Sequence, residues 1–158
     1  MRIGIGWDSH PLAAGRPLIL GGVSIAHARG LLGVSDADAL LHAVIDAMLG
    51  AAALGDIGQH FPESDPAMRG ISSLLLLQRA QELIHAAGWR IGNIDSVIIA
   101  EQPRLAPYIP AMREQIAQAL GLSLSRISIK AKTAEGLDSV GQGRAIQAQA
   151  VALLEEMP

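Results

Sequence analysis

The segment VSDADALLHAVIDAMLGAAALGD, residues 34–56, constrains the fold more than any other part of the sequence. Ser35 followed three residues later by Asp38 resembles a capping box, and Gly55 is typical of a helix end. The large apolar residues between them recur at helical spacing: Leu40, Leu41, Val44, Ile45, Met48 and Leu49. We therefore predict an apolar helix that begins after Ser35, around which the other elements have to be arranged.

Strands are predicted on both sides of this helix. In residues 1–7 isoleucine alternates with glycine, which is typical of a strand that another backbone approaches closely. Gly21 and Gly22 stand between two short apolar runs and predict an antiparallel hairpin. Further strands are predicted at 93–100, at 126–132 and, in preference to a helix, at 144–156.

Two more helices are predicted, at 72–87 and 111–120, because each has helical spacing and is followed by glycine. Residues 56–70, 101–110 and 133–143 are rich in proline or glycine and are predicted as loops. An antiparallel hairpin argues against strict βαβ winding. We expect the α+β class: a mixed sheet of about four to five strands, with helices packed on one face, in a single domain over residues 1–158.

Composition excludes several classes of function. The 158 residues carry a net charge of -3, and lysine and arginine are scattered, so no basic patch for nucleic acid is predicted. Without cysteine there is neither a disulfide nor a thiolate metal site. No apolar stretch approaches the roughly 18 residues that a membrane span needs. The start MRIGIGWDSH lacks the pattern of a signal peptide, so we expect a cytoplasmic location and no membrane partner.

One carboxylate and two imidazoles suggest a metal site. Asp8 and His10 lie two residues apart at the end of the first predicted strand, where an extended backbone points both side chains the same way. His42 interrupts the apolar helix, and Asp46 lies one turn further on, where it could accept the second ring proton of His42. Two imidazoles and a carboxylate with one open position are typical of a catalytic zinc. A strand cap and a satisfied core histidine are the alternatives.

Five segments, in order along the whole chain, resemble a known family. They are DSH, SDADALLHAVIDAMLGAAALGDIG, FPESDP, IIAEQPRLAPYIPAMR and IKAKTAEGL. Together they resemble the 2-C-methyl-D-erythritol 2,4-cyclodiphosphate synthases of non-mevalonate isoprenoid biosynthesis. The resemblance implies a homotrimer with sites between subunits. It also implies a reaction in which the 2-phosphate of 4-diphosphocytidyl-2-C-methyl-D-erythritol 2-phosphate attacks the β-phosphorus and expels CMP.

The resemblance also implies roles for particular residues. A zinc-type ion (or Mn²⁺) would be held by Asp8, His10 and His42, and Mg²⁺ or Mn²⁺ on the diphosphate by Glu135. Catalytic roles fall to Ser35, Thr133 and Glu135. The substrate-binding positions are Asp8, Ser9, His10, Val34, Ser35, Asp56, Ile57, Gly58, Phe61, Pro62, Glu63, Ser64, Asp65, Ala100, Glu101, Gln102, Pro103, Arg104, Leu105, Ala106, Lys132, Thr133, Ala134, Glu135, Ser139 and Gln142.

The chain departs from the family pattern in two regions. Val34 stands where a phosphate-positioning histidine is usual, and Ala37, where glycine is usual, is expected to be a mild change inside the helix start. Ser139, Gln142 and Arg144 stand where an aromatic residue, an arginine and a glutamate usually line the trimer axis, which in some members binds an isoprenoid diphosphate.

Two other functions fit parts of this pattern. A mononuclear iron oxygenase also uses two histidines and a carboxylate, but such sites generally lie in all-β barrels. A trimer that binds cytidine nucleotides but has lost activity with its histidine at position 34 is the second alternative.

Overall fold

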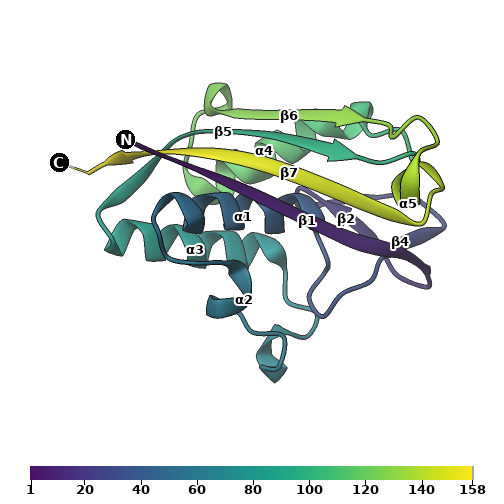
Figure 1. The fold of residues 1–158 in the computed structure, drawn as a ribbon, viewed down its shortest axis with the longest axis horizontal. Helices are drawn as coiled ribbons and strands as arrows, with labels where there is room; N and C mark the ends of the chain where they lie inside the picture. The colour runs from purple at the N-terminus through teal and green to yellow at the C-terminus, as the bar shows by residue number, and fades with distance from the viewer. Residues whose placement is uncertain (158) are drawn as a thin grey trace.

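A five-stranded mixed sheet carries all the larger helices on one face (Figure 1). The computed structural model describes residues 1–157, and its strand order is β4-β1-β7-β5-β6, with a separate β2-β3 hairpin. The strands are β1 (Arg2–Ala14), β2 (Leu18–Leu20), β3 (Val23–Ile25), β4 (Arg29–Leu31), β5 (Trp89–Ile99), β6 (Ile127–Lys132) and β7 (Ala145–Glu156). The α-helices are α1 (Ala39–Ala51), α2 (Ile57–His60), α3 (Ser73–Ala86), α4 (Ile109–Leu120) and α5 (Asp138–Gly141).

The predicted fold class is confirmed. Among residues 1–157 only β5 and β6 pair in parallel, the Gly21-Gly22 hairpin forms, and residues 145–156 are a strand. Several local predictions are wrong. The strand β4 was not expected, the predicted loops contain the short helices α2 and α5, and β1 continues to Ala14, so that Asp8 and His10 lie inside the strand. Pairing of β1 with β7 as far as Pro11 and with β4 beyond it sustains this extra length.

Helix α1 packs directly on the backbone of β1. A Cβ atom at Gly6 would lie 1.9 Å from the carbonyl oxygen of Ala43, and one at Gly4 would lie 2.0 Å from that of Ala47. The predicted close approach of another backbone is thereby confirmed, and α1 is the element that approaches. Leu40, Leu41, Ile45, Met48 and Leu49 of α1 are fully buried.

Helix α1 is capped by Asp38, and the predicted capping box with Ser35 at its start is wrong. The Asp38 carboxylate accepts the backbone N–H of Leu41 and those of Gly21 and Gly22 in the hairpin turn. Ala37 therefore precedes the helix, in the left-handed region with φ 57°, which glycine adopts without strain but alanine does not. Ala37 was expected to be a mild change inside the helix start. It lies instead before the helix, in a strained backbone conformation.

The sheet face opposite the helices is uncovered and carries exposed apolar side chains on β1 and β7, beside polar groups such as the Lys130–Asp95 ion pair on β6 and β5. Ile3 and Ile5 of β1 are 71% and 73% exposed, and Trp7 and Val151 are also exposed. Period-two alternation puts these side chains on the face away from α1, because Gly4 and Gly6 face the helix. Among residues 1–157, no helix is long and apolar enough to cross a membrane.

We predict that Gly6→Ala lowers the free energy of unfolding by about 3 kcal/mol or more, because the new methyl group overlaps the Ala43 carbonyl. Gly50→Ala is the matched control. A Cβ atom there meets nothing closer than the Ile5 carbonyl oxygen at 3.9 Å, so helix propensity should raise stability by up to about 1 kcal/mol. Urea unfolding measures both; equal effects of the two substitutions would contradict the packing argument.

A second prediction concerns the buried cap. Burial raises the pKa of Asp38 to about 6, against the lowering effect of its three N–H donors. A carboxyl group whose pKa is higher in the folded state binds protons on folding, so its contribution to stability falls as pH rises from about 4 to about 6. Relative to Asp38→Asn, the wild-type protein should lose up to about 3 kcal/mol over this range in urea unfolding. A difference that stays constant, or grows in favour of wild type, would refute the raised pKa.

Candidate metal and substrate site

The three predicted metal ligands converge at the start of α1. The Oδ2 atom of Asp8 lies 2.9 Å from Nε2 of His10 and 2.9 Å from Nδ1 of His42, and these two nitrogens lie 3.1 Å apart. All three donor atoms thus fall within the span of one coordination sphere. Although His42 is far from Asp8 and His10 in sequence, the packing of α1 on β1 brings the three side chains together.

The outer nitrogens of both histidines bind the protein. Nδ1 of His10 lies 3.0 Å from the carbonyl oxygen of Leu32, and because a carbonyl only accepts, this nitrogen carries the proton. Nε2 of His42 lies 2.9 Å from Oγ of Ser73 and 3.2 Å from Oγ of Ser35. With the proton on each outer nitrogen, two lone pairs and a carboxylate face one another at the centre. A shared cation satisfies this arrangement, so the donor set fits a divalent metal ion.

In the absence of an ion, the Asp8 carboxylate and the two inner ring nitrogens would repel one another unless protons lay between them. Burial would raise the pKa of Asp8, but hydrogen bonds with His10 and His42 hold that pKa well below its usual range. Burial would lower the pKa of His10, but the hydrogen bond and charge of Asp8 raise it. Asp8 is therefore ionised at neutral pH and is available as a ligand.

Asp46 does not hold His42, so this part of the prediction is wrong. Its carboxylate accepts the backbone N–H of Ile57 at 2.7 Å and so holds the start of α2 against α1. Burial raises its pKa. The residues at the outer nitrogen of His42 are Ser35 and Ser73, and Ser73 was missed because it lies 31 residues away, at the start of a different helix.

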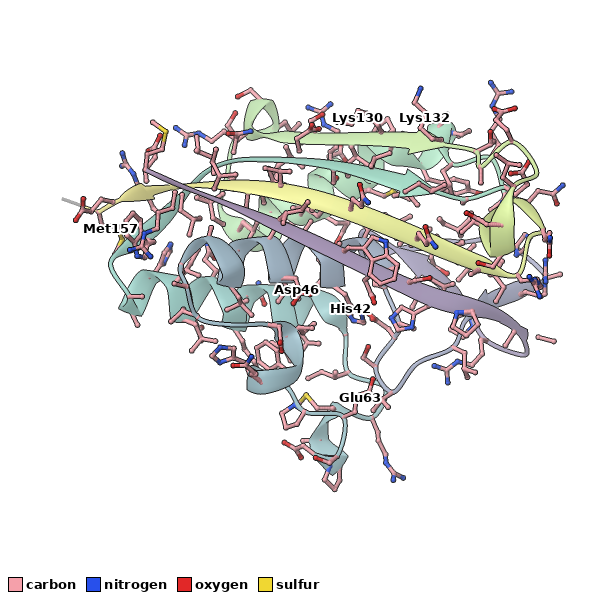
Figure 2. The ribbon with its side chains drawn as sticks, viewed as in Figure 1. His42, Asp46, Glu63, Lys130, Lys132 and Met157 are labelled. Carbon is pink, nitrogen blue, oxygen red and sulfur yellow. The ribbon has the colours of Figure 1, made fainter. Side chains whose placement is uncertain are left out.

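A cavity opens beside the three ligands. Figure 2 labels His42 and Asp46 on α1 and Glu63 in the segment after α2, all of which line it. The lining includes these predicted positions: Asp8, His10, Val34, Ser35, His42, Ile57, Gly58, Phe61 and Glu63. Asp46, Met68, Ile71 and Leu76 complete the wall without having been predicted to do so. The cavity therefore joins a polar end at the ligands to an apolar wall.

Five predicted neighbours of this group do not line the cavity: Ser9, Asp56, Pro62, Ser64 and Asp65. Ser9 alternates with Asp8 and His10 along β1 and so belongs to the opposite sheet face. Asp56 caps α2 by accepting the N–H of Gln59, and Asp65 accepts the N–H of Ala67. In this chain both aspartates have local structural partners.

The remaining predicted residues form a second group beyond the ends of β5 and β6. The Ala100 N–H donates to the Lys132 carbonyl, and the Ala134 N–H donates to Oε2 of Glu101. The Thr133 hydroxyl donates to Oε1 of Glu135 at 2.7 Å. Other members of this group are Gln102, Pro103, Arg104, Leu105 and Ala106, while Ser139 and Gln142 belong to the nearby segment of α5.

The two groups do not share a cavity within one chain. None of the residues beyond β5 and β6 lines the cavity beside His42. In the strand order, β1 and β6 are three strand spacings apart, roughly 14 Å. The buried side chains of Ile98 and Ile146 fill the sheet face between them.

The sequence profile of the YgbB family matches residues 1–155. The chain belongs to the YgbB family. It is 58% identical over 156 residues to the 2-C-methyl-D-erythritol 2,4-cyclodiphosphate synthase of Gloeobacter violaceus, covering 99% of this chain and 96% of that one. The resemblance drawn from the five sequence motifs is confirmed.

Solved structures share the fold. A 2C-methyl-D-erythritol-2,4-cyclodiphosphate synthase in a CDP-bound form superposes with a TM-score of 0.90 at 41% identity, covering 98% of this chain and 100% of that one. The bifunctional IspDF from Campylobacter jejuni gives a TM-score of 0.95 at 36% identity. This chain is covered to 99% in that comparison but spans only 42% of the bifunctional protein. An iron oxygenase in an all-β barrel is contradicted by the family and by the helix-covered sheet.

We predict that His42→Ala weakens Zn²⁺ binding at least about 100-fold, because removal of a direct ligand costs more than the 10- to 100-fold typical of its supporting groups. The apolar fold around position 42 should remain. Competition with a chromogenic chelator measures the affinity, and circular dichroism checks the fold. His85→Ala, an exposed histidine on α3, is the control and should bind Zn²⁺ as wild type does. Unchanged affinity in His42→Ala would refute the ligand assignment.

Proposed function

We propose that this protein cyclises 4-diphosphocytidyl-2-C-methyl-D-erythritol 2-phosphate to 2-C-methyl-D-erythritol 2,4-cyclodiphosphate and releases CMP, which makes it a phosphorus-oxygen lyase. The observation that carries the proposal is the convergence of Asp8, His10 and His42 at a cavity in a YgbB-family chain. The relatives named as synthases match over nearly its whole length.

Two kinds of divalent ion are part of the proposal. Asp8, His10 and His42 would hold zinc or Mn²⁺, since imidazole and carboxylate suit both ions. Glu135 would hold Mg²⁺ or Mn²⁺ together with the diphosphate of the substrate, through oxygen ligands. When bound, these ions neutralise phosphate charge, including the charge that develops on the leaving oxygen.

The reaction needs no activated side chain. The 2-phosphate is a monoester with a second pKa of about 6, so it is largely ionised at neutral pH. One of its oxygens forms a bond to the β-phosphorus while the bond from that phosphorus to the bridging oxygen breaks. CMP leaves with the bridging oxygen and both bonding electrons, and no net proton transfer is required. Positioning therefore supplies much of the rate enhancement, and oriented intramolecular reactions gain roughly 7 to 11 kcal/mol.

The proposed residue roles follow from the need to bring two negatively charged phosphate groups together. Thr133 and the exposed Lys132 at the end of β6 (Figure 2) would donate to phosphate oxygens, as would the hydroxyl or backbone N–H of Ser35. Residues 100–106 would present backbone groups to the cytosine edge. Asp56 and Gly58 would contact the ribose, and residues 61–65 would lie beside the diphosphate and methylerythritol.

We propose a homotrimer, with each substrate held between two subunits. The metal-ligand group and the group beyond β5 and β6 do not share a cavity within one chain, so one substrate can bridge them only if neighbouring copies contribute one group each. The uncovered face that carries Ile3, Ile5 and Trp7 offers an apolar surface for association. Sedimentation of the purified protein tests the stoichiometry.

Val34 supports the alternative of an impaired enzyme. It lines the cavity next to Ser35, but its side chain has no hydrogen-bond donor with which to position a phosphate. An impaired family member would bind cytidine diphosphate normally and turn over slowly. Val34→His restores a donor at this position, so a large rise in rate in that variant would favour the impaired enzyme.

We predict that the wild-type protein releases CMP from the authentic substrate in the presence of Mg²⁺ or Mn²⁺, and that Glu135→Gln lowers kcat about 100-fold by weakening the ion on the diphosphate. Chromatography of the nucleotide products measures the rate. Glu114→Gln, an exposed glutamate on α4, is the control and should leave the rate unchanged. Normal binding of cytidine diphosphate without CMP release by the wild type would reject the activity.

A further inference from the structure

We infer that Ser73 and Asp36 are positioning residues that favour the metal-binding tautomer of His42 and thereby strengthen the metal site. This inference rests on the metal site proposed above and not on the reaction. It concerns a hydrogen-bonded chain that runs from the inner nitrogen of His42, through its ring and the Ser73 hydroxyl, to the Asp36 carboxylate.

The proton of the Ser73 hydroxyl is committed to Asp36. The hydroxyl donates to Oδ1 of Asp36, and the backbone N–H of Ser73 donates to Oδ2 at 2.8 Å. A carboxylate has no proton to return, so it can only accept these bonds. Oγ of Ser73 is consequently left as an acceptor on its other side, where Nε2 of His42 lies 2.9 Å away.

This geometry selects one of the two neutral forms of the His42 ring. If Nε2 carries the proton, it donates to Ser73. If Nε2 is unprotonated, its lone pair faces the lone pair of the Ser73 oxygen in a site where Ser73 is fully buried and His42 is 9% exposed. Repulsion at this distance, away from water, is costly. The Ser73 side therefore favours the proton on Nε2, whereas the Asp8 carboxylate, 2.9 Å from Nδ1, favours the proton on Nδ1 as long as no cation is bound. Once a cation neutralises Asp8, only the preference of Ser73 remains, and the lone pair of Nδ1 faces the ion.

Ser35 cannot make this selection. Its oxygen lies 3.2 Å from Nε2 and accepts the backbone N–H of Ala37, but among residues 1–157 its own proton has no carboxylate or carbonyl acceptor. It can either accept from a protonated Nε2 or donate to an unprotonated one. Two serines thus lie at similar distances from Nε2 of His42. Only Ser73 is restricted to accepting from it, because its own proton is donated to Asp36.

The same two residues also fix the position of the ring. Helix α3 has no side-chain cap from its own Ser72, and Asp36 serves its first N–H instead, from 37 residues earlier in the chain. Asp36 thus fastens the start of α3 to the segment before α1, where the Asp36 N–H also donates to the Ile71 carbonyl. The Ser73 oxygen is held at the position that the ring requires.

The first test is Zn²⁺ affinity by chelator competition. Ser73→Ala removes the acceptor and leaves Ser35 free to donate to Nε2, which places the ring proton on Nδ1, the nitrogen needed by the metal. We expect Zn²⁺ affinity to fall 10- to 100-fold, the range typical of lost partners of metal-bound histidines. Asp36→Ala should have a similar effect although Ser73 is retained, because the freed hydroxyl can then donate to Nε2.

Ser96→Ala is the matched control. Ser96 is a buried serine on β5 whose hydroxyl donates to the Ser128 carbonyl, away from the cavity, so the variant should lose stability but keep Zn²⁺ affinity. Affinity in Ser73→Ala equal to that of Ser96→Ala would overturn the inference.

The second test reads the tautomer directly. In metal-free protein labelled with ¹⁵N-histidine, NMR should show a larger fraction of neutral His42 protonated on Nδ1 in Ser73→Ala and in Asp36→Ala than in wild type. Equal tautomer populations in wild type and in whichever of the two variants folds would overturn the inference. Both measurements are independent of turnover, so an inactive enzyme with the expected tautomer and Zn²⁺ affinity would reject only the proposed reaction.

Discussion

The contact between helix α1 and the glycines of β1 is the constraint on which the rest of the structure depends. Gly6 lets the Ala43 carbonyl approach the strand backbone, and His42 is the residue immediately before Ala43. Asp8 and His10 follow Gly6 on the same face of β1. Any side chain at Gly6 would push the helix outward and carry the His42 imidazole away from the two donors on the strand. The same packing that buries the core therefore sets the distances between the donors.

Three aspartates, one buried and two half-buried, lie in α1 or in the segment just before it and join it to its neighbours. Asp38 ties the helix to the hairpin turn, Asp36 ties it to α3, and Asp46 ties it to α2. Each carboxylate accepts backbone N–H groups that would otherwise be unsatisfied on burial. The three aspartates thus join the secondary-structure elements around the cavity, and Asp36 also acts on the His42 imidazole through the Ser73 hydroxyl.

Much of the fold could be predicted because periodicity reflects burial directly. The apolar spacing of α1, the glycine alternation in β1 and the Gly21-Gly22 hairpin each involve neighbouring residues. The errors concern partners that are distant in sequence. Asp38 rather than Ser35 caps α1, because the hairpin turn lies against its carboxylate. Asp46 has helical spacing from His42, yet the N–H of Ile57 takes its carboxylate.

The sequence by itself determined the donor types, the α+β class and, through five motifs in order, the family to which the chain belongs. Only the tertiary structure decided which nitrogen of His42 faces Asp8 and which residues stand behind the ring. It also decided that the predicted site residues form two separate groups. Local spacing records which face of an element a residue occupies. Tautomers and cavities depend instead on atoms brought within 3 Å by helices and strands far apart in the chain, and no pattern of neighbouring residues encodes those distances.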